Sequence, residues 1–186
     1  MNKMHYVLNT PISEPFSKTS SKVLFGMGCF WGAERLFWQL PGVISTAVGY
    51  AGGETLNPNY EQVCGGQTLH AEVVLVVYEP EQISLSDLLI IFWQEHDPTQ
   101  GMRQGNDRGS QYRSVIYTFN DKDYMQVLQS KDAYQKQLVK YNLSTITTEI
   151  KKDQVLYYAE DYHQQYLAKN PAGYCGLKGT GIILNE

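Results

Sequence analysis

Apolar and polar residues along the chain form short apolar runs that alternate with stretches of helical spacing. Short runs rich in apolar or β-branched residues predict strands over residues 22–28, 43–50, 70–78, 113–119 and 144–150. Apolar side chains three or four positions apart predict helices over residues 29–40, 84–96 and 121–140, with a shorter helical segment within 154–169. Elements of both kinds therefore alternate along most of the chain.

Turn-forming residues mark the boundaries between these elements. Ser84 and Asp87 are placed for a helix N-cap and its partner near the third position. Residues 51–60, rich in Gly, Asn and Pro, and the polar residues 97–111 predict loops. The second loop is long for a compact domain, and loops of such length are often functional.

The order of the elements resembles a split βαβ pattern, in which helices pack on a mixed sheet. The predicted fold class is α+β: a two-layer sandwich with a mixed sheet of the ferredoxin-like type and an irregular glycine-rich tail. We find no internal repeat or linker and expect one domain over residues 1–186. Within it we expect an irregular arm (1–20), a core that carries the chemistry (22–169) and a flexible tail (170–186).

The composition limits the kind of protein. Of 186 residues, 42% are hydrophobic and 18% charged, which excludes an intrinsically disordered chain. The net charge of −4 indicates no broad basic face, so we expect no nucleic-acid partner. No apolar stretch approaches the ~18 residues of a membrane span, and the polar start lacks the apolar region of a signal peptide. We expect a monomer in the reducing cytoplasm, with no membrane partner.

Three cysteines, an odd number, are the first candidates for chemistry. They lie far apart without a C-x-x-C pair, so we expect no metal site. Cys29 stands where a buried strand turns into a helix, and the free N–H groups of a helix N-terminus favour a thiolate. This position predicts a lowered pKa and a nucleophilic thiol, with Gly26, Gly28 and Gly32 leaving room for a reactant. A buried structural thiol is an equal alternative.

Two aromatic residues and one acid are further candidates. Phe30 and Trp31 come directly after Cys29 and are either the apolar walls of a substrate pocket or ordinary core residues. Glu72 shares strand parity with Val74 and lies at the end of an apolar row. Burial there would raise its pKa and keep it protonated, as a general acid requires, whereas a frayed strand end would leave it in solvent.

Four weaker candidates lie elsewhere in the chain. Asp107 and Tyr112 stand in or beside the long loop, and Tyr60 lies close after a proline; phenols donate hydrogen bonds without carrying charge. Cys175 in the glycine-rich tail is placed as a resolving thiol would be, or is an incidental surface cysteine. Cys64, in a predicted short helical turn, has no special context.

These residues leave other classes of function open. One is a Cys–His hydrolase that uses Cys29 with His70 or His163 as the base. The segment GCFWG, however, lacks the C-G-[SA]-C-[WY] pattern of papain-like enzymes. Another is a noncatalytic module that binds Met-rich segments.

A series of motifs runs from about Phe25 to Gly181. They read GCFWGAERLF, LPGV, GYAGG, NPNYEQVC, HAEVV, FWQEHDPTQGMRQGND, QYRS, ITTEI, YYAEDYHQQYL and KNPAGYCG. In this order they resemble the peptide-methionine sulfoxide reductase A (MsrA) family, whose signature GCFWG is long and specific. The resemblance implies an enzyme that reduces the S epimer of methionine sulfoxide, free or within proteins, to methionine.

The resemblance also implies how the first step proceeds. Cys29 would attack the sulfoxide sulfur and become a sulfenic acid. Phe30 and Trp31 would wall the pocket for the S-methyl group of the substrate. Glu72 would protonate the sulfoxide oxygen as the bond to sulfur breaks.

The remaining candidates receive roles by the same resemblance. The hydroxyl groups of Tyr60 and Tyr112 would hydrogen-bond to the sulfoxide oxygen, and Asp107 would help to organise the site in the later thiol-exchange steps. Cys175 would form a disulfide with Cys29, which thioredoxin would reduce, with dithiothreitol as a substitute in vitro. No metal or organic cofactor is then required.

The chain departs from some family members at one position. These members have a further recycling cysteine eight residues after the first C-terminal one, where this chain has Ile183. We therefore expect Cys175 to pass electrons directly to the reductant, and nothing favours a part for Cys64.

Overall fold

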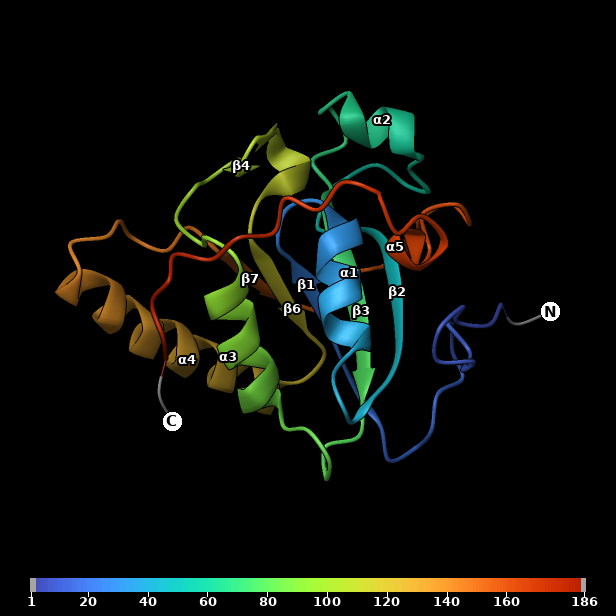
Figure 1. Ribbon diagram of the computed structural model, residues 1–186, viewed down its shortest axis with the longest axis horizontal. Helices are drawn as coiled ribbons and strands as arrows, with labels where there is room; N and C mark the ends of the chain where they lie inside the picture. The colour runs from blue at the N-terminus through green and yellow to red at the C-terminus, as the bar shows by residue number, and fades with distance from the viewer. Residues whose placement is uncertain (1–2, 185–186) are drawn as a thin grey trace.

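A six-stranded mixed sheet forms the centre of the fold (Figure 1). The structure is a computed structural model that describes residues 3–184. The strands are β1 (Ser21–Gly26), β2 (Val43–Ala51), β3 (Ala71–Tyr78), β6 (Val115–Thr118), β7 (Glu149–Lys152) and β8 (Tyr157–Tyr158). They lie in the order β7–β6–β1–β3–β2–β8. Strands β6 and β7 are parallel, and the other neighbouring pairs of this sheet are antiparallel.

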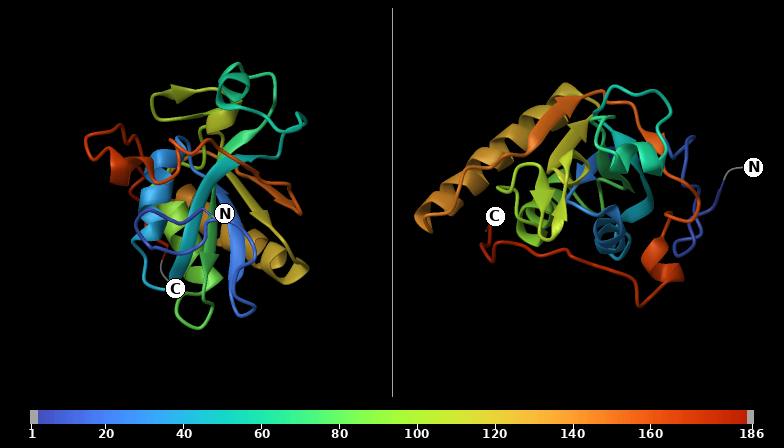
Figure 2. Two further views of the ribbon diagram at one scale, coloured as in Figure 1. Left: turned by 90° about the vertical axis from the view of Figure 1, so that its right-hand side faces the viewer. Right: turned by 90° about the horizontal axis from the view of Figure 1, so that it is seen from above.

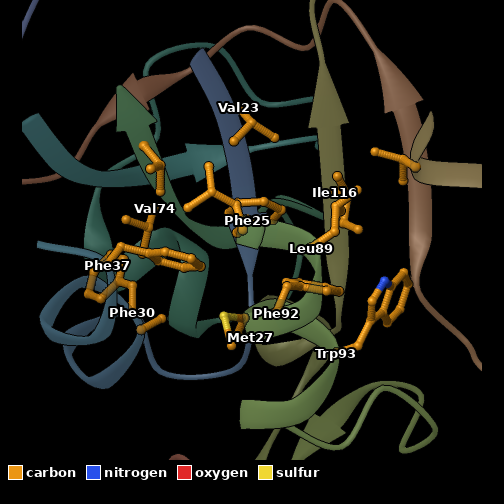
Figure 3. Close-up of a cluster of buried hydrophobic side chains, with 14 of the residues drawn as sticks. Val23, Phe25, Met27, Phe30, Phe37, Val74, Leu89, Phe92, Trp93 and Ile116 are labelled. Atoms are coloured by element: carbon orange, nitrogen blue, oxygen red, sulfur yellow. The ribbon is translucent and has the colours of Figure 1, made fainter. Parts of the chain in front are cut away.

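Helices cover one face of this sheet: α1 (Phe30–Trp38), α3 (Leu85–Glu95) and α4 (Asp121–Lys140). Phe25 of β1 stacks between Phe37 of α1 and Phe92 of α3, with ring centroids 5.0 and 5.1 Å apart (Figure 3). The other face is covered by the N-terminal arm, where Ile12 and Phe16 pack on the sheet. Figures 1 and 2 show the arm and α4 at opposite edges of the sheet, with α4 on the β7 side and the arm on the β2 side. The predicted α+β fold with a central mixed sheet is confirmed.

Short elements lie at the end of the sheet where α1 begins. They are α2 (Tyr60–Cys64), α5 (Tyr166–Lys169), the 3₁₀ helix η1 (Ser110–Tyr112) and the two-stranded hairpin of β4 (Arg103–Gln104) and β5 (Asp107–Arg108). In Figure 1 α2 and β4 lie at this same end. These elements carry most of the candidate residues outside α1 and β3.

The predicted ends of α3 and α4 agree with their capping residues. The backbone N–H of Asp87 donates to Ser84 Oγ at 3.2 Å, and the N–H of Ser84 donates to Asp87 Oδ2 at 2.8 Å. This reciprocal pair is the predicted capping box of α3. Helix α4 spans the predicted residues, with Asn120 as its N-cap.

The predicted strand over residues 144–150 is wrong over residues 144–148. Strand β7 covers Glu149–Lys152, because the backbone upstream finds other partners. The N–H of Ile146 donates to the side chain of Gln135 at 2.7 Å, and the N–H of Thr147 donates to the carbonyl of Pro98 at 2.8 Å. Strand β8 and the β4–β5 hairpin were not predicted, since neither exceeds two residues a strand.

The C-terminal tail is irregular from residue 170 to residue 184 and lies along the helical face. Tyr134 of α4 hydrogen-bonds the hydroxyl of Thr180 at 2.9 Å, and Gln94 of α3 donates to the carbonyl of Leu184 at 3.2 Å. The predicted flexibility of this tail stays a prediction. Within the described chain, no helix has the length and apolar character to cross a membrane.

Candidate active site

The candidate site forms where β1 leads into α1. Cys29 is the N-cap of α1, but its side chain makes no capping hydrogen bond. Instead Glu72, on β3, accepts a hydrogen bond through Oε2 from the backbone N–H of Phe30 at 3.0 Å. This N–H is in the first turn of α1 and has no partner within the helix. The helix N-terminus therefore brings the Cys29 thiol and the Glu72 carboxyl together.

Glycine is required in the turn that precedes Cys29. Gly28 has φ +89°, in the left-handed region, and a Cβ there would lie 2.6 Å from the Cβ of Gln104. A Cβ on Gly26 would lie 3.0 Å from the carbonyl oxygen of Glu72. Because neither glycine has a side chain, α1 can begin close to β3 and to the loop that carries the β4–β5 hairpin.

The burial predicted for Glu72 from strand parity is confirmed, since the residue is 2% exposed. Burial raises the pKa of its carboxyl group to about 8; the hydrogen bond from Phe30 lowers this pKa and the charge of Asp107 raises it. The carboxyl group is therefore protonated at neutral pH. A neutral carboxyl beside a thiol can donate a proton to a reacting oxygen.

The lowered pKa predicted for Cys29 is wrong. Burial, and next the nearby carboxyl group of Glu72, raise the pKa of the thiol to about 12, although the nearby backbone N–H of Trp31 lowers it. The helix N-terminus thus acts on the sulfur in the predicted direction, but desolvation outweighs it. At neutral pH the site therefore holds two protons, one on each group.

Two phenols border the same site. Tyr60 begins α2 and Tyr112 ends η1, and both are half-buried. Burial raises the pKa of both; a hydrogen bond with Cys64 raises that of Tyr60 further, and the charge of Glu72 raises that of Tyr112. Both hydroxyl groups are therefore neutral hydrogen-bond donors at physiological pH.

The tail and the β4–β5 hairpin bring Cys175 and Asp107 to the site. The hydroxyl of Tyr174 donates to Asp107 Oδ2 at 3.2 Å, and Cys175 is the next residue. Asp107 and Cys175 also lie close enough to Cys29 to raise the pKa of its thiol. The predicted residues from the loop and the tail therefore lie near the thiol.

The two aromatic residues that follow the cysteine have different surroundings. Phe30 is 1% exposed and packs in the core, with its ring centroid 5.1 Å from that of His163. Trp31 is partly exposed; its indole stacks on Tyr166 with centroids 3.8 Å apart and donates to His163 Nδ1 at 3.1 Å. The ring of His163 also lies 4.6 Å from that of Tyr60. Aromatic rings therefore line one side of the site.

Sequence reasoning missed the residues before α5 that support these rings. Glu160 accepts hydrogen bonds from the backbone N–H of Tyr60 at 2.8 Å and from the hydroxyl of Tyr50 at 2.9 Å. The amide of Gln164 pairs with the backbone N–H and carbonyl of Val48 at 2.9 and 2.8 Å. The polar and aromatic motif YYAEDYHQQYL was the signal for this support, because it has no apolar period of its own.

The family model described as "Peptide methionine sulfoxide reductase" matches residues 21–182. A peptide methionine sulfoxide reductase MsrA from Brucella anthropi is 64% identical over 178 residues, which are 96% of this chain and 82% of the relative. The chain belongs to the peptide methionine sulfoxide reductase A family. It is an enzyme that reduces the S epimer of methionine sulfoxide to methionine.

Solved structures of this reductase family have the same fold. Methionine sulfoxide reductase A of Corynebacterium diphtheriae is 45% identical with a TM-score of 0.88, and the match covers 94% of this chain and 85% of that one. Mxr1 from Saccharomyces cerevisiae in reduced form is 34% identical with a TM-score of 0.80, covering 93% and 96%. These likenesses agree with the mixed sheet described above.

The histidines of this reductase are not placed as the base of a Cys–His hydrolase. His70 accepts from the backbone N–H of Gly53 at 3.1 Å and contacts the carbonyl of Thr55 through Nε2 at 2.7 Å, so both ring nitrogens are used. Nδ1 of His163 accepts from an indole. In the part of the chain that the structure describes, neither histidine hydrogen-bonds to Cys29.

Two further features concern thiols and metals. Cys64 is exposed at the end of α2, and its thiol accepts a hydrogen bond from Tyr60, so it lies closer to the site than its sequence context indicated. Among residues 3–184, no group of three His, Cys, Asp or Glu side chains is arranged to hold a metal ion.

Proposed function

We propose that Cys29 is the nucleophile of this reductase, that Glu72 protonates the sulfoxide oxygen, and that Cys175 resolves the oxidised Cys29. The substrates are free methionine sulfoxide and oxidised proteins. One observation carries the proposal: the protonated carboxyl of Glu72 is bound to the N-terminus of the helix that Cys29 caps.

In the first step the sulfur of Cys29 attacks the sulfoxide sulfur and takes its oxygen. The oxygen moves to the Cys29 sulfur and forms a new sulfur–oxygen bond there, while the sulfur–oxygen bond of the substrate and the transient sulfur–sulfur bond break. Methionine leaves with the electron pair, and Cys29 becomes a sulfenic acid. The oxygen gains negative charge during attack, so a proton from Glu72 lowers the barrier. The thiol proton of Cys29 replaces the proton that Glu72 gives up, and no net charge is created in the buried site.

The walls of the site orient the substrate for this attack. Tyr112 supplies a neutral hydrogen-bond donor for the sulfoxide oxygen, and Tyr60 supplies a second once its hydroxyl turns from Cys64 to the substrate. Phe30 and Trp31 provide the apolar side for the S-methyl group, and stacking on Tyr166 holds the indole in place. An oxygen-binding side and a methyl-binding side together distinguish the S epimer from the R epimer.

Recycling uses the second thiol. Cys175 attacks the sulfenic acid, a disulfide with Cys29 forms, and water leaves. Thioredoxin then reduces the disulfide; yeast Mxr1 has been crystallised in complex with Trx2, which supports this partner. Asp107 organises this step through its hydrogen bond with Tyr174. Thiol chemistry of this kind needs no metal or organic cofactor, and dithiothreitol can replace thioredoxin.

The proposal extends to architecture and setting. Strand β3 lies between β1 and β2, which α1 connects, and this order supports a split βαβ (ferredoxin-like) core within a single domain over residues 1–186. We propose a monomer without nucleic-acid or membrane partners. We place it in the cytoplasm, because a reducing compartment keeps the two thiols available for recycling.

The proposal is tested with separated epimers and mapped peptides. The purified chain with dithiothreitol should reduce the S epimer, and Cys29→Ser should abolish the reaction. After one equivalent of sulfoxide without reductant, peptide mapping should show a Cys29–Cys175 disulfide with Cys64 free. Activity on the R epimer alone, unchanged activity of the Cys29→Ser variant, or a Cys29–Cys64 link would each contradict the assignment.

A further inference from the structure

Gly32 lies in the first turn of α1, three residues after Cys29, so both positions share one face of the helix. Glycine inside a helix costs about 1 kcal/mol relative to alanine. Gly32 is not among the glycines with positive φ, so its backbone conformation does not require glycine. The reason for glycine at this position therefore lies in what packs against it.

The tail packs against it. A Cβ built on Gly32 would lie 2.9 Å from the Sγ of Cys175, closer than real Cβ contacts, and 3.5 Å from the Cβ of Leu177. Figures 1 and 2 show the tail passing beside α1. The sulfur of Cys175 therefore occupies the space that any side chain at position 32 would take, on the helix face that leads to Cys29.

We propose that Gly32 is a positioning residue for the resolving step: its missing side chain forms the seat from which the Cys175 thiol attacks the oxidised Cys29. This inference rests on the proposed function and concerns only the second step. The reactant for which Gly32 leaves room is therefore the Cys175 thiol and not the sulfoxide, so Gly32 takes no part in the first step.

The neighbours of Cys175 hold the tail over this seat from both sides. On one side Tyr174 donates its hydroxyl to Asp107 at 3.2 Å. On the other side Leu177 packs against the main core. The tail thus spans the gap between the β4–β5 hairpin and α1, with the Cys175 thiol between these contacts.

The step that this seat serves is balanced without a further reactant. The Cys175 sulfur attacks the sulfur of the Cys29 sulfenic acid, an S–S bond forms and the S–O bond breaks. The hydroxyl leaves as water with the proton of the Cys175 thiol. The Cys175 sulfur is oxidised and the Cys29 sulfur is reduced by the same electron pair. A displacement of about 1 Å at a reacting atom can cost roughly 100-fold in rate.

Gly32→Ala tests the seat, because the added methyl group displaces the thiol while alanine favours the helix. The reduced full-length chain, freed of reductant, is mixed with one equivalent of the S epimer of N-acetylmethionine sulfoxide. We measure the methionine product, the loss of free thiols and the dimedone adduct of Cys29 over time. We expect the first product at the wild-type rate, disulfide formation slowed by at least about tenfold, and a Cys29 sulfenic acid that accumulates.

Cys175→Ser and the double variant Gly32→Ala/Cys175→Ser are the matched controls. The double variant should form the first product at the same rate as Cys175→Ser, because the seat then has no thiol to position. Disulfide formation at the wild-type rate in Gly32→Ala would overturn the inference, and so would a slower first product in both backgrounds, which assigns Gly32 to the substrate site. If the wild-type chain makes product without oxidation of Cys29, the proposed function itself has failed.

Discussion

Glu34 and Glu72 are both buried carboxyl groups, but their surroundings differ. Glu34 accepts hydrogen bonds from the hydroxyl of Thr46 at 3.0 Å and from the backbone N–H and side-chain amide of Gln165 at 2.8 and 2.7 Å. Glu72 accepts one hydrogen bond, from Phe30, in the part of the chain that the structure describes. Glu34 therefore joins α1, β2 and the segment before α5, whereas Glu72 leaves hydrogen-bonding capacity for a ligand.

The difference separates a structural acid from a chemical one. Burial raises the pKa of Glu34 to about 7 and that of Glu72 to about 8, so burial alone does not distinguish them. Their hydrogen-bond partners distinguish them. A carboxyl group whose two oxygens both accept hydrogen bonds from the protein stabilises the fold, whereas one with an oxygen left for a ligand can exchange a proton with a substrate. Substitutions at the two positions should therefore change different quantities.

The largest effect is expected from Glu72→Gln. The amide keeps the shape of the side chain but cannot supply the proton, so the rate of the first turnover should fall by about 10²- to 10⁴-fold. Product formation is measured with the S epimer in a single turnover, and the free energy of unfolding is measured by denaturant titration. A rate within threefold of wild type would show that the sulfoxide oxygen receives its proton elsewhere.

Glu34→Gln is the matched substitution and should act on stability. One oxygen becomes an NH₂ group that faces hydrogen-bond donors, at a cost of about 1–3 kcal/mol in the free energy of unfolding. The rate of the first chemical step should stay close to wild type. A loss of rate as large as that of Glu72→Gln, in a chain that remains folded, would remove the distinction between the two acids.

The free energy of unfolding should also depend on pH differently in wild type and in Glu34→Gln. A carboxyl whose folded pKa is raised stabilises the fold below its unfolded pKa and loses this contribution as the pH rises through its folded pKa. For Glu34 the contribution is lost between about pH 4.5 and pH 7. Glu34→Gln should therefore show a flatter dependence of unfolding free energy over this range than wild type.

The pH dependence of the rate tests which acid acts in the reaction. If the protonated Glu72 is required, the single-turnover rate should be constant below about pH 8 and fall about tenfold per unit above it. Glu72→Gln should lack this fall, and Glu34→Gln should retain it. A rate that rises with pH would show that the Cys29 thiolate attacks without the acid.

The sequence predicted Glu72 and overlooked Glu34, and the reason is physical. Parity along a strand places a side chain on one face, so the apolar row through Val74 indicated burial of Glu72. Glu34 is buried by Gln165, 131 residues away, and no local pattern reports such a contact. The same limit explains the error at Cys29, where a rule about helix ends was applied without the burial that outweighs it.

The fold was predictable to a similar extent. The bounds of α4 and the capping box of α3 follow from local residues and are confirmed. The strand predicted over residues 144–150 was displaced because its backbone partners, Gln135 and the carbonyl of Pro98, come from distant elements. The aromatic side of the site depends in the same way on His163 and Tyr166, which reach Trp31 across the chain.

A smaller effect is expected at Trp31, on a wall of the site that Glu34 supports. Gln165, which Glu34 binds, precedes the residue on which Trp31 stacks, so the structural acid supports one wall of the site. Trp31→Phe keeps an aromatic ring but loses the hydrogen bond to His163, and we expect KM to rise about 2- to 10-fold with a smaller change in kcat. Steady-state kinetics with dithiothreitol measure both constants. A change in kcat alone would assign Trp31 to the chemical step.

The smallest effect is expected at Cys64, although this thiol hydrogen-bonds to a phenol of the site. Serine can accept the same hydrogen bond from Tyr60, so Cys64→Ser should leave the first-turnover rate within about twofold of wild type. Disulfide formation should also be unchanged, because the structure seats Cys175 and not Cys64 against α1. Thiol counting after one turnover should show two thiols lost in the variant as in wild type. If the variant instead stops at one thiol lost, Cys64 shares the resolving role, and the division into two reacting thiols and one bystander is wrong.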